Sequence, residues 1–358
     1  MCDALHSIPS SPSSTEIPDD DESCTAFGIA ATVSYESRDP DPGLQKKLVL
    51  NNLSAGAGFV LAETPSRLLP SVNTWGGGLV RLGARPYPTV DGAQPLVNIF
   101  QEGTLFGGWD WEGHQLFASA GILSNSWLDH SRATLEDLQG PWALTQGLLD
   151  SSDIGIAINY SGFDENLSGS CAVVTGEGLN REMNEGQNIE CFVKAKPFGF
   201  FDDKDPEWLT LAAYFQNGSK GLGYAADNRL GLSGTSIVDL HYHQSQIKGV
   251  LKFMTAEGVD GDSAVTPNTL TAQIEGTAPV IPVSLSIRYD QITWAPEEED
   301  SRQMRNTWGL SIPVGPIKLI VERSHDIYGS QALEIAGAGV DEETIWTIGA
   351  SGSLGIQK

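Results

Sequence analysis

The sequence contains no long apolar run. Nowhere in its 358 residues does a stretch approach the roughly 18–20 continuous apolar residues of a membrane-spanning helix. This absence excludes a helical membrane protein, but not a transmembrane barrel, whose strands alternate apolar and polar residues. Because 40% of the residues are hydrophobic, we expect a folded chain rather than wholesale disorder.

Basic residues are also scarce. The chain has 21 Lys and Arg against 46 Asp and Glu, a formal net charge of −25. Such a surface repels phosphates, so nucleic acid is not an expected partner. The first 24 residues hold six of the acids, no base and many Ser and Pro, so we predict a flexible acidic arm over 1–24 and one domain over 25–358. The arm shows neither the basic nor the apolar region of a signal peptide.

Cysteines are few, and catalytic motifs are missing. None of the four Cys forms the C-x-x-C spacing of a zinc site or the C-x-x-C-H of haem attachment. The segment "GTSIVDLH" is not a nucleophile elbow, and "SGSCAVVTGEGLN" lacks the strand-to-helix context of a nucleotide-binding loop. We therefore expect no enzymatic activity, no cofactor and no metal.

What the sequence does contain is alternation. In "DIGIAINYSGF", Asp153 to Phe163, the apolar side chains Ile154, Ile156 and Ile158 fall on one face, while small and polar residues fall on the other. The stretches "VSLSIRYDQ", "WGLSIPV" and "WTIGASGSLGI" repeat this pattern. A period of two is typical of β-strands, whose apolar face packs on a core in a soluble sandwich or on lipid in a membrane barrel.

About sixteen strands are predicted, an even number as in bacterial barrels. They cover residues 26–36, 47–62, 73–85, 96–110, 113–124, 152–162, 167–176, 187–197, 207–216, 235–244, 247–258, 267–277, 281–292, 304–315, 316–325 and 342–356.

The predicted connections alternate between long and short. Long loops follow the odd-numbered strands, from "PDPDPGLQ" after the first through 86–95, 125–151, 177–186, 217–234, 258–266, 293–303 and 326–341. Short turns follow most even ones, at 111–113, 164–166, 244–246, 277–280 and 315–316, although 63–72 and 198–206 are longer.

This asymmetry favours a transmembrane barrel, which has short periplasmic turns and long external loops, over a sandwich. It also places both termini on the periplasmic side. Four aromatic residues lie where interfacial girdles are expected: Tyr160, Phe163, Trp208 and Trp294.

Two stretches resemble a family of outer-membrane porins. The run "DIGIAINYSG…CAVVTGEGLN" resembles the mid-barrel hairpin of phosphate-selective-porin-like proteins, and "KKLVLNNLSAGAGF" resembles an early strand of related siderophore-uptake porins. The resemblance spans residues 25–358 and implies a barrel of roughly 16 strands, often trimeric, with a loop folded into the pore. Around "FASAGILSNSW" the family usually shows a basic residue and Pro-Phe-Gly, but Gly121 is followed here by Ile122 and Leu123, and the last residue is Lys358 rather than an aromatic.

A pore selects solutes by its size and lining charge, so its function would reside in a constriction. The best candidate is the third long loop, Asn125–Ser152, in which Ser131 can cap a short helix and Trp142 and Leu148 can pin the loop to the inner wall. Such a fold leaves charged residues facing the pore: Asp129, His130, Arg132, Glu136 and Asp137. In the alternative, the loop only caps the barrel from outside.

Strand parity assigns further polar residues to the lumen: Glu190, Lys194, Lys196, Asp239, His241, His243, Lys248, Lys252, Arg288, Asp290, Lys318 and Glu322. Their mixed signs create a transverse field that favours small polar solutes, and the acid excess predicts a weak preference for cations. Asp239, His241 and His243 share one face, but solvated histidines are the preferred interpretation over a metal site.

One cystine is predicted. Cys171 and Cys191 lie at equal distances from the loop near residue 181 that joins two consecutive strands, and both have outward parity. Opposed residues of an antiparallel pair have Cβ atoms about 4.5–5.5 Å apart, close enough for a disulfide after a small adjustment. Two free thiols on the lipid face are the alternative.

These patterns together predict a passive diffusion porin of the bacterial outer membrane, surrounded by lipid and open to small solutes or ions, and the family resemblance adds a homotrimer to the expected partners. Two alternatives stay open. The chain could be a soluble secreted β-rich binding protein, or a barrel that sheathes a partner protein.

Overall fold

A computed structural model gives the structure of the chain. It describes residues 24–39, 47–65, 72–84, 100–125, 127, 148–149, 152–175, 187–200, 208–220, 225–226, 228–240, 245–257, 266–278, 283–295, 299–315, 317–332 and 341–357. The predicted acidic arm therefore lies outside the described residues, apart from Cys24. No helix among the residues described is long and apolar enough to cross a membrane.

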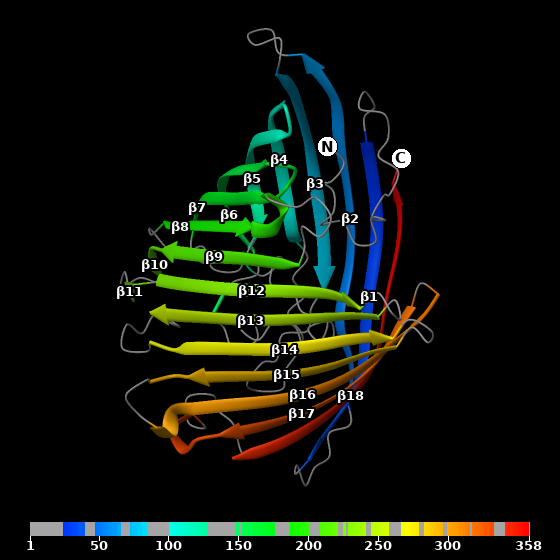
Figure 1. The fold of residues 1–358 in the computed structure, drawn as a ribbon, viewed down its shortest axis with the longest axis vertical. Helices are drawn as coiled ribbons and strands as arrows, with labels where there is room; N and C mark the ends of the chain where they lie inside the picture. The colour runs from blue at the N-terminus through cyan, green and yellow to red at the C-terminus, as the bar shows by residue number, and fades with distance from the viewer. Residues whose placement is uncertain are drawn as a thin grey trace.

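Sixteen antiparallel strands form one closed barrel (Figure 1). They are β1 (Cys24–Asp39), β2 (Lys47–Pro65), β3 (Asn73–Ala84), β4 (Phe100–Trp111), β5 (His114–Ser124), β6 (Ser152–Gly162), β7 (Leu167–Val174), β8 (Asn188–Ala195), β9 (Leu209–Asn217), β12 (Asn228–Leu240), β13 (Ser245–Glu257), β14 (Asn268–Ala278), β15 (Val283–Thr293), β16 (Arg302–Val314), β17 (Ile317–Tyr328) and β18 (Glu342–Gln357). A separate hairpin pairs β10 (Ser219–Lys220) with β11 (Ala225–Ala226), and two 3₁₀ turns cover Pro197–Phe200 and Glu299–Ser301.

The barrel closes between its first and last strands. β1 pairs with β18 from Ala26 opposite Gln357 to Asp39 opposite Thr344, and the blue and red strands run side by side in Figure 1. Every other barrel strand pairs with the neighbours that precede and follow it in the barrel. The predicted all-β antiparallel barrel is confirmed, and a single closed sheet excludes the two-sheet sandwich that was its alternative.

Side chains alternate between the two faces as the sequence predicts. On β6, Ile156 and Ile158 are 62% and 60% exposed, while Asp153 and Ala157 on the opposite face are buried. Among the described residues the most exposed large apolar side chain is Leu105, at 69%, and it belongs to the same outward surface. An apolar band on the outside of a closed sheet is the surface that a transmembrane barrel presents to lipid.

Three predicted short turns are confirmed. Glu112 and Gly113 join β4 to β5 with positive φ values of 45° and 80°, and Gly315 joins β16 to β17 with φ of 61°. The β6–β7 turn takes positive φ at Phe163, Asp164 and Glu165, and the Asn166 N–H donates to the Phe163 carbonyl at 3.0 Å. A left-handed backbone conformation suits such tight turns, because the twist of the turn then matches the twist of the flanking strands.

The predicted bounds of the loop, strand and turn between residues 217 and 246 are wrong. The supposed loop 217–234 contains the β10–β11 hairpin and the first part of β12, which begins at Asn228. Of the supposed turn at 244–246, Ser245 and Gln246 are strand residues, because β13 begins at Ser245 and Gln246 pairs with Asp239. Leu230 and Leu232 are outward-facing strand residues that keep the period of two.

The aromatic prediction is partly wrong. Trp208 and Phe163 are about half exposed at the short-turn end, where Trp208 and Phe198 pack edge to face with ring centroids 4.6 Å apart. Trp294, however, is only 6% exposed and packs with Ile292 and Leu148. It has the inward parity of Ile292, so it cannot belong to an outer girdle.

Candidate pore wall and constriction

The inner face of the barrel is mainly polar along β14–β17. On β15 the inward residues Ser286, Arg288 and Asp290 are all buried, and the outward Leu285 and Ile287 are exposed. Two strands further along the same wall, β17 repeats this arrangement, since Glu322, Ser324 and Asp326 are inward and fully buried. Polar side chains on the concave face are therefore packed against one another rather than isolated in water.

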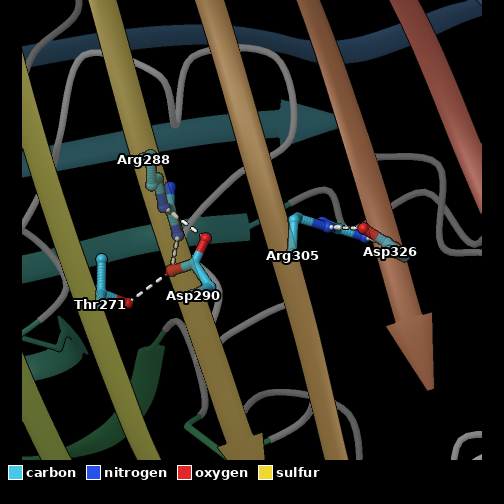
Figure 2. Close-up of polar contacts among 5 residues, drawn as sticks. All are labelled: Thr271, Arg288, Asp290, Arg305 and Asp326. Atoms are coloured by element: carbon cyan, nitrogen blue, oxygen red, sulfur yellow. Dashed lines mark hydrogen bonds and ion pairs between the residues drawn. The ribbon is translucent and has the colours of Figure 1, made fainter.

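One row of this wall crosses four strands. The sheet register places Thr271 opposite Asp290, Asp290 opposite Arg305, and Arg305 opposite Asp326. Figure 2 shows these side chains on neighbouring strands, with Arg305 directed at Asp326. Two parallel bonds join that pair, from Nε to Oδ1 at 2.6 Å and from Nη2 to Oδ2 at 2.5 Å. This two-point geometry is the strongest that a guanidinium and a carboxylate can form.

Asp290 forms an ion pair with a second arginine, Arg288, on its own strand. The Arg288 Nε lies 2.7 Å from Asp290 Oδ2, and its Nη2 donates to Oδ1 at 2.9 Å. The Thr271 hydroxyl donates to the same Oδ1 at 2.5 Å (Figure 2). Each carboxylate of the row is thus matched by a guanidinium, so this part of the wall is a set of fixed dipoles with little net charge.

The predicted lining residues have different surroundings. Glu190 and Lys194 lie on the inward face of β8, with Lys196 just beyond its end, and Lys248 and Lys252 lie on that of β13. Lys248 is in register with Glu275 of β14 and Lys252 with Thr271. Lys318 and Glu322 have inward parity on β17.

Other predicted lining residues are either buried in the wall, placed only by strand pairing, or outside the described residues. Arg288 and Asp290 are inward, but they are only 5% and 0% exposed. Their opposite charges therefore neutralise each other within the wall instead of facing the lumen. Asp239 is placed only by its pairing with Gln246 on the β12–β13 ladder, and His241 and His243 lie outside the described residues. In the part of the chain that the structure describes, no group of three or more His, Cys, Asp or Glu could hold a metal ion.

The third long loop begins against the inner wall. Trp127, just after β5, is 3% exposed and packs with Tyr214, Met254 and Leu149. Tyr214 and Met254 have the inward parity of β9 and β13, so this cluster lies inside the barrel. The Asn125 amide donates to the Tyr214 hydroxyl at 3.3 Å and its Oδ1 accepts the Trp127 N–H at 3.0 Å.

A glycine leaves room for this contact. Gly231 of β12 faces inward, and a Cβ at this position would lie 3.0 Å from the Trp127 ring. The strand backbone and the indole therefore approach more closely than a larger residue would allow.

The same loop also ends against the inner wall. Leu148 is 1% exposed and packs with Ile292, Trp294, Ala256 and Ala332. The buried Arg229 of β12 donates through Nε to the Leu148 carbonyl at 2.7 Å. Its Nη1 donates to the carbonyls of Asn228 and Glu257 at 2.8 and 2.6 Å. One guanidinium thus ties the loop to two strands of the wall.

These anchors bear on the predicted constriction. Leu148 was expected to pin the loop, and its placement agrees, whereas Asp129, His130, Arg132, Glu136, Asp137 and Trp142 lie outside the described residues. Asn125, Trp127, Arg229 and Tyr214 were missed by sequence reasoning. The inward parity of Arg229 was hidden by the mistaken loop 217–234, which broke the alternation at that point.

The predicted register of the β7–β8 hairpin is confirmed. Cys171 pairs directly with Cys191, their Cα atoms are 4.1 Å apart, and the two sulfurs are bonded. Both residues share the outward face with Val173 and Ile189, which are about half exposed. The cystine therefore lies on the outward, apolar face of the barrel.

Comparisons with known proteins agree with the fold. No protein-family model matches the sequence, and no curated protein sequence matches it either. Among solved structures, the chain is similar to OmpT, an outer-membrane protein of Vibrio cholerae, with a TM-score of 0.61 and 14% identity over 95% of this chain and 100% of that one. It is similar to Salmonella typhi OmpF in complex with daunomycin, with a TM-score of 0.60 and 12% identity over 95% and 100%.

A third similar structure is the outer-membrane channel DcaP of Acinetobacter baumannii, with a TM-score of 0.56 and 10% identity over 96% of this chain and 100% of that one. The structural neighbours include outer-membrane porins, and this chain has their 16-strand barrel fold. At these identities the likeness concerns the fold alone.

Proposed function

We propose that this protein is an outer-membrane porin, a passive diffusion channel for small hydrophilic solutes or ions. The observation that carries the proposal is the closed sixteen-strand barrel with an apolar outer face and a polar inner face. Such a barrel encloses an interior wide enough for an aqueous channel, and its lining acts as a filter by size and charge.

The third long loop is the proposed constriction. Its first residues, at Trp127, and its last, at Leu148 and Leu149, are buried in clusters inside the barrel. A loop held inside at both ends has its middle available to narrow the lumen. We propose that its charged residues face the solute path: Asp129, His130, Arg132, Glu136 and Asp137.

The proposed selectivity is a weak preference for cations. The lining residues that we propose are Glu190, Lys194, Lys196, Asp239, His241, His243, Lys248 and Lys252, with Arg288 and Asp290 as a fixed pair in the wall. This lining is mixed in sign, so the net charge of −25 decides the preference, through the field at the mouths. A phosphate-selective pore, which the family resemblance suggests, would prefer anions instead.

Two measurements test the function. Purified protein reconstituted in a planar bilayer should give single-channel steps, and at low salt the reversal potential should favour potassium over chloride. Well-folded protein that forms no channel would reject the pore, and a chloride preference would reject the cation selectivity. Sedimentation in detergent tests the homotrimer that we also propose.

A deletion tests the constriction. Removing 133–146 leaves both anchored ends in place and should raise single-channel conductance, because the lumen loses its narrowing segment. An unchanged conductance in a folded deletion variant would mean that the loop does not set the pore diameter.

A further inference from the structure

Three successive outward rows cross β16, β17 and β18 side by side. The first row, Leu310–Val321–Ile348, is entirely apolar. The third row, Asn306–His325–Thr344, is entirely polar, and His325 Nδ1 lies 3.1 Å from the Thr344 hydroxyl. Between them lies the row Trp308–Arg323–Trp346, which we call the Trp–Arg–Trp row.

This succession marks a membrane boundary. The apolar row Leu310–Val321–Ile348 lies nearer the short β16–β17 turn, and the polar row Asn306–His325–Thr344 lies nearer the longer connection between β17 and β18. Along β18 the outward positions from Trp346 to Ile356 are apolar or glycine in sequence, and these eleven residues span about 25 Å of membrane thickness in a tilted strand. Tryptophan is enriched at this level because its ring is apolar and its N–H is polar. The long connections of such barrels are external, so the row belongs to the outer leaflet.

Arg323 is an unusual residue for this outer surface. It is exposed, and its guanidinium carbon lies 5.8 Å from the centroid of the Trp346 ring. Trp308 and Trp346 flank it in register and are themselves 50% and 48% exposed. Among the described residues, no carboxylate forms an ion pair with Arg323, although the chain as a whole is strongly acidic.

The chemistry of the row selects its occupant. A guanidinium at the edge of the hydrocarbon layer presents a planar fork of donors that matches phosphate oxygens. The two indoles lie at headgroup depth, and the apolar row below them offers Leu310, Val321 and Ile348 to acyl chains. We propose that the Trp–Arg–Trp row binds the phosphate headgroup of an anionic lipid in the outer leaflet.

This site does not depend on the channel activity, because it lies on the outer face of the barrel. The lipid phosphate takes the role that a carboxylate would have in a protein ion pair. The indoles and the apolar row hold the same molecule by its glycerol and chain regions, which a free phosphate ion would lack.

Tryptophan quenching tests the proposal. The full chain is placed in phosphatidylcholine vesicles that carry dibrominated phosphatidylglycerol or dibrominated phosphatidylcholine as the quencher. In the native protein, tryptophan fluorescence should be quenched about fivefold more efficiently by the anionic lipid than by the zwitterionic one. This ratio is the effect expected of one basic residue near a membrane surface. Arg323→Gln should bring the ratio of the two quenchers close to one, and Arg323→Lys should restore part of the preference through charge alone.

Arg302→Gln is the matched control, because Arg302 is an exposed arginine on the same strand as Trp308 but lies further toward the external end. It should retain the native preference. The proposal is overturned if the native protein shows no preference, if Arg323→Gln keeps it, or if Arg302→Gln abolishes it equally. Channel conductance, measured in parallel, reports folding of each variant and tests the proposed function separately.

Discussion

At the scale of single residues, the bidentate pair between Arg305 and Asp326 carries the largest energetic consequence. The Asp326 side chain is 1% exposed, so removal of its partner leaves a buried carboxylate without compensation. Arg305→Gln should lower the free energy of unfolding by about 3–5 kcal/mol, and the double variant Arg305→Met/Asp326→Leu by clearly less. Equilibrium urea unfolding in detergent measures both, with Arg302→Gln as the exposed control. Equal losses in the single and double variants would contradict the pairing.

A second prediction at this scale concerns the cystine. Cys171 and Cys191 occupy one directly paired position on the outward face of the β7–β8 hairpin. Mass spectrometry of the unfolded, unreduced chain should find one disulfide-linked peptide pair that contains both residues. Peptides in which either cysteine is alkylated without prior reduction would show instead that the two thiols are free on the lipid face.

At the scale of elements, the third long loop depends on strand β12. Arg229 joins the Leu148 carbonyl to the backbone of Asn228 and Glu257, and hydrogen bonds from a charged donor are worth about 1.5–3 kcal/mol. Arg229→Gln should free the C-terminal end of the loop and increase the noise of the open-channel current. The barrel should stay closed, because the β12–β13 ladder does not need this side chain.

The matched control for this variant is Lys248→Gln, which removes an inward charge from the neighbouring β13 without touching the loop anchors described above. It should change selectivity slightly and leave the noise unchanged. If Arg229→Gln gives the native noise level, the loop is held by its apolar contacts at Trp127 and Leu148 alone.

At the scale of the whole molecule, charge is unevenly distributed. On the described inner wall acids and bases match, as Lys248 faces Glu275 and Arg305 lies between Asp290 and Asp326. Much of the acid excess therefore lies elsewhere, for example in "APEEEDS" between β15 and β16. Selectivity that arises at a charged mouth should depend strongly on ionic strength.

The preference for potassium should be clear at 0.1 M salt, where the screening length is about 10 Å, and nearly vanish at 1 M, where it is about 3 Å. Replacing Glu297, Glu298 and Glu299 by Gln should weaken the low-salt preference in the same direction. Reversal potentials across a tenfold salt gradient measure both effects. A preference that is equally large at both salt concentrations would place the selective charges inside the narrow part of the lumen.

Local pattern determined much of this protein without tertiary information. The strand predicted at 152–162 has those bounds in the structure, and Ile154, Ile156 and Ile158 face outward as predicted. Cys171 and Cys191 could be paired because an antiparallel hairpin has only one register once its loop is centred. These features follow from period-two alternation and from connection lengths, both of which are properties of neighbouring residues.

What only the tertiary structure decided is which distant residues meet inside the barrel. Trp294 was assigned to a girdle from its place at a strand end. Closure of the sheet instead brings it into contact with Leu148, which belongs to a loop much earlier in the sequence. Arg229 was missed because its partners, the carbonyls of Leu148 and Glu257, become neighbours only when β12, β13 and the loop are assembled. The Trp–Arg–Trp row likewise needs the register of three strands. Alternation tells which face a side chain takes, but the identity of its neighbours on that face depends on register and closure, which no local pattern contains.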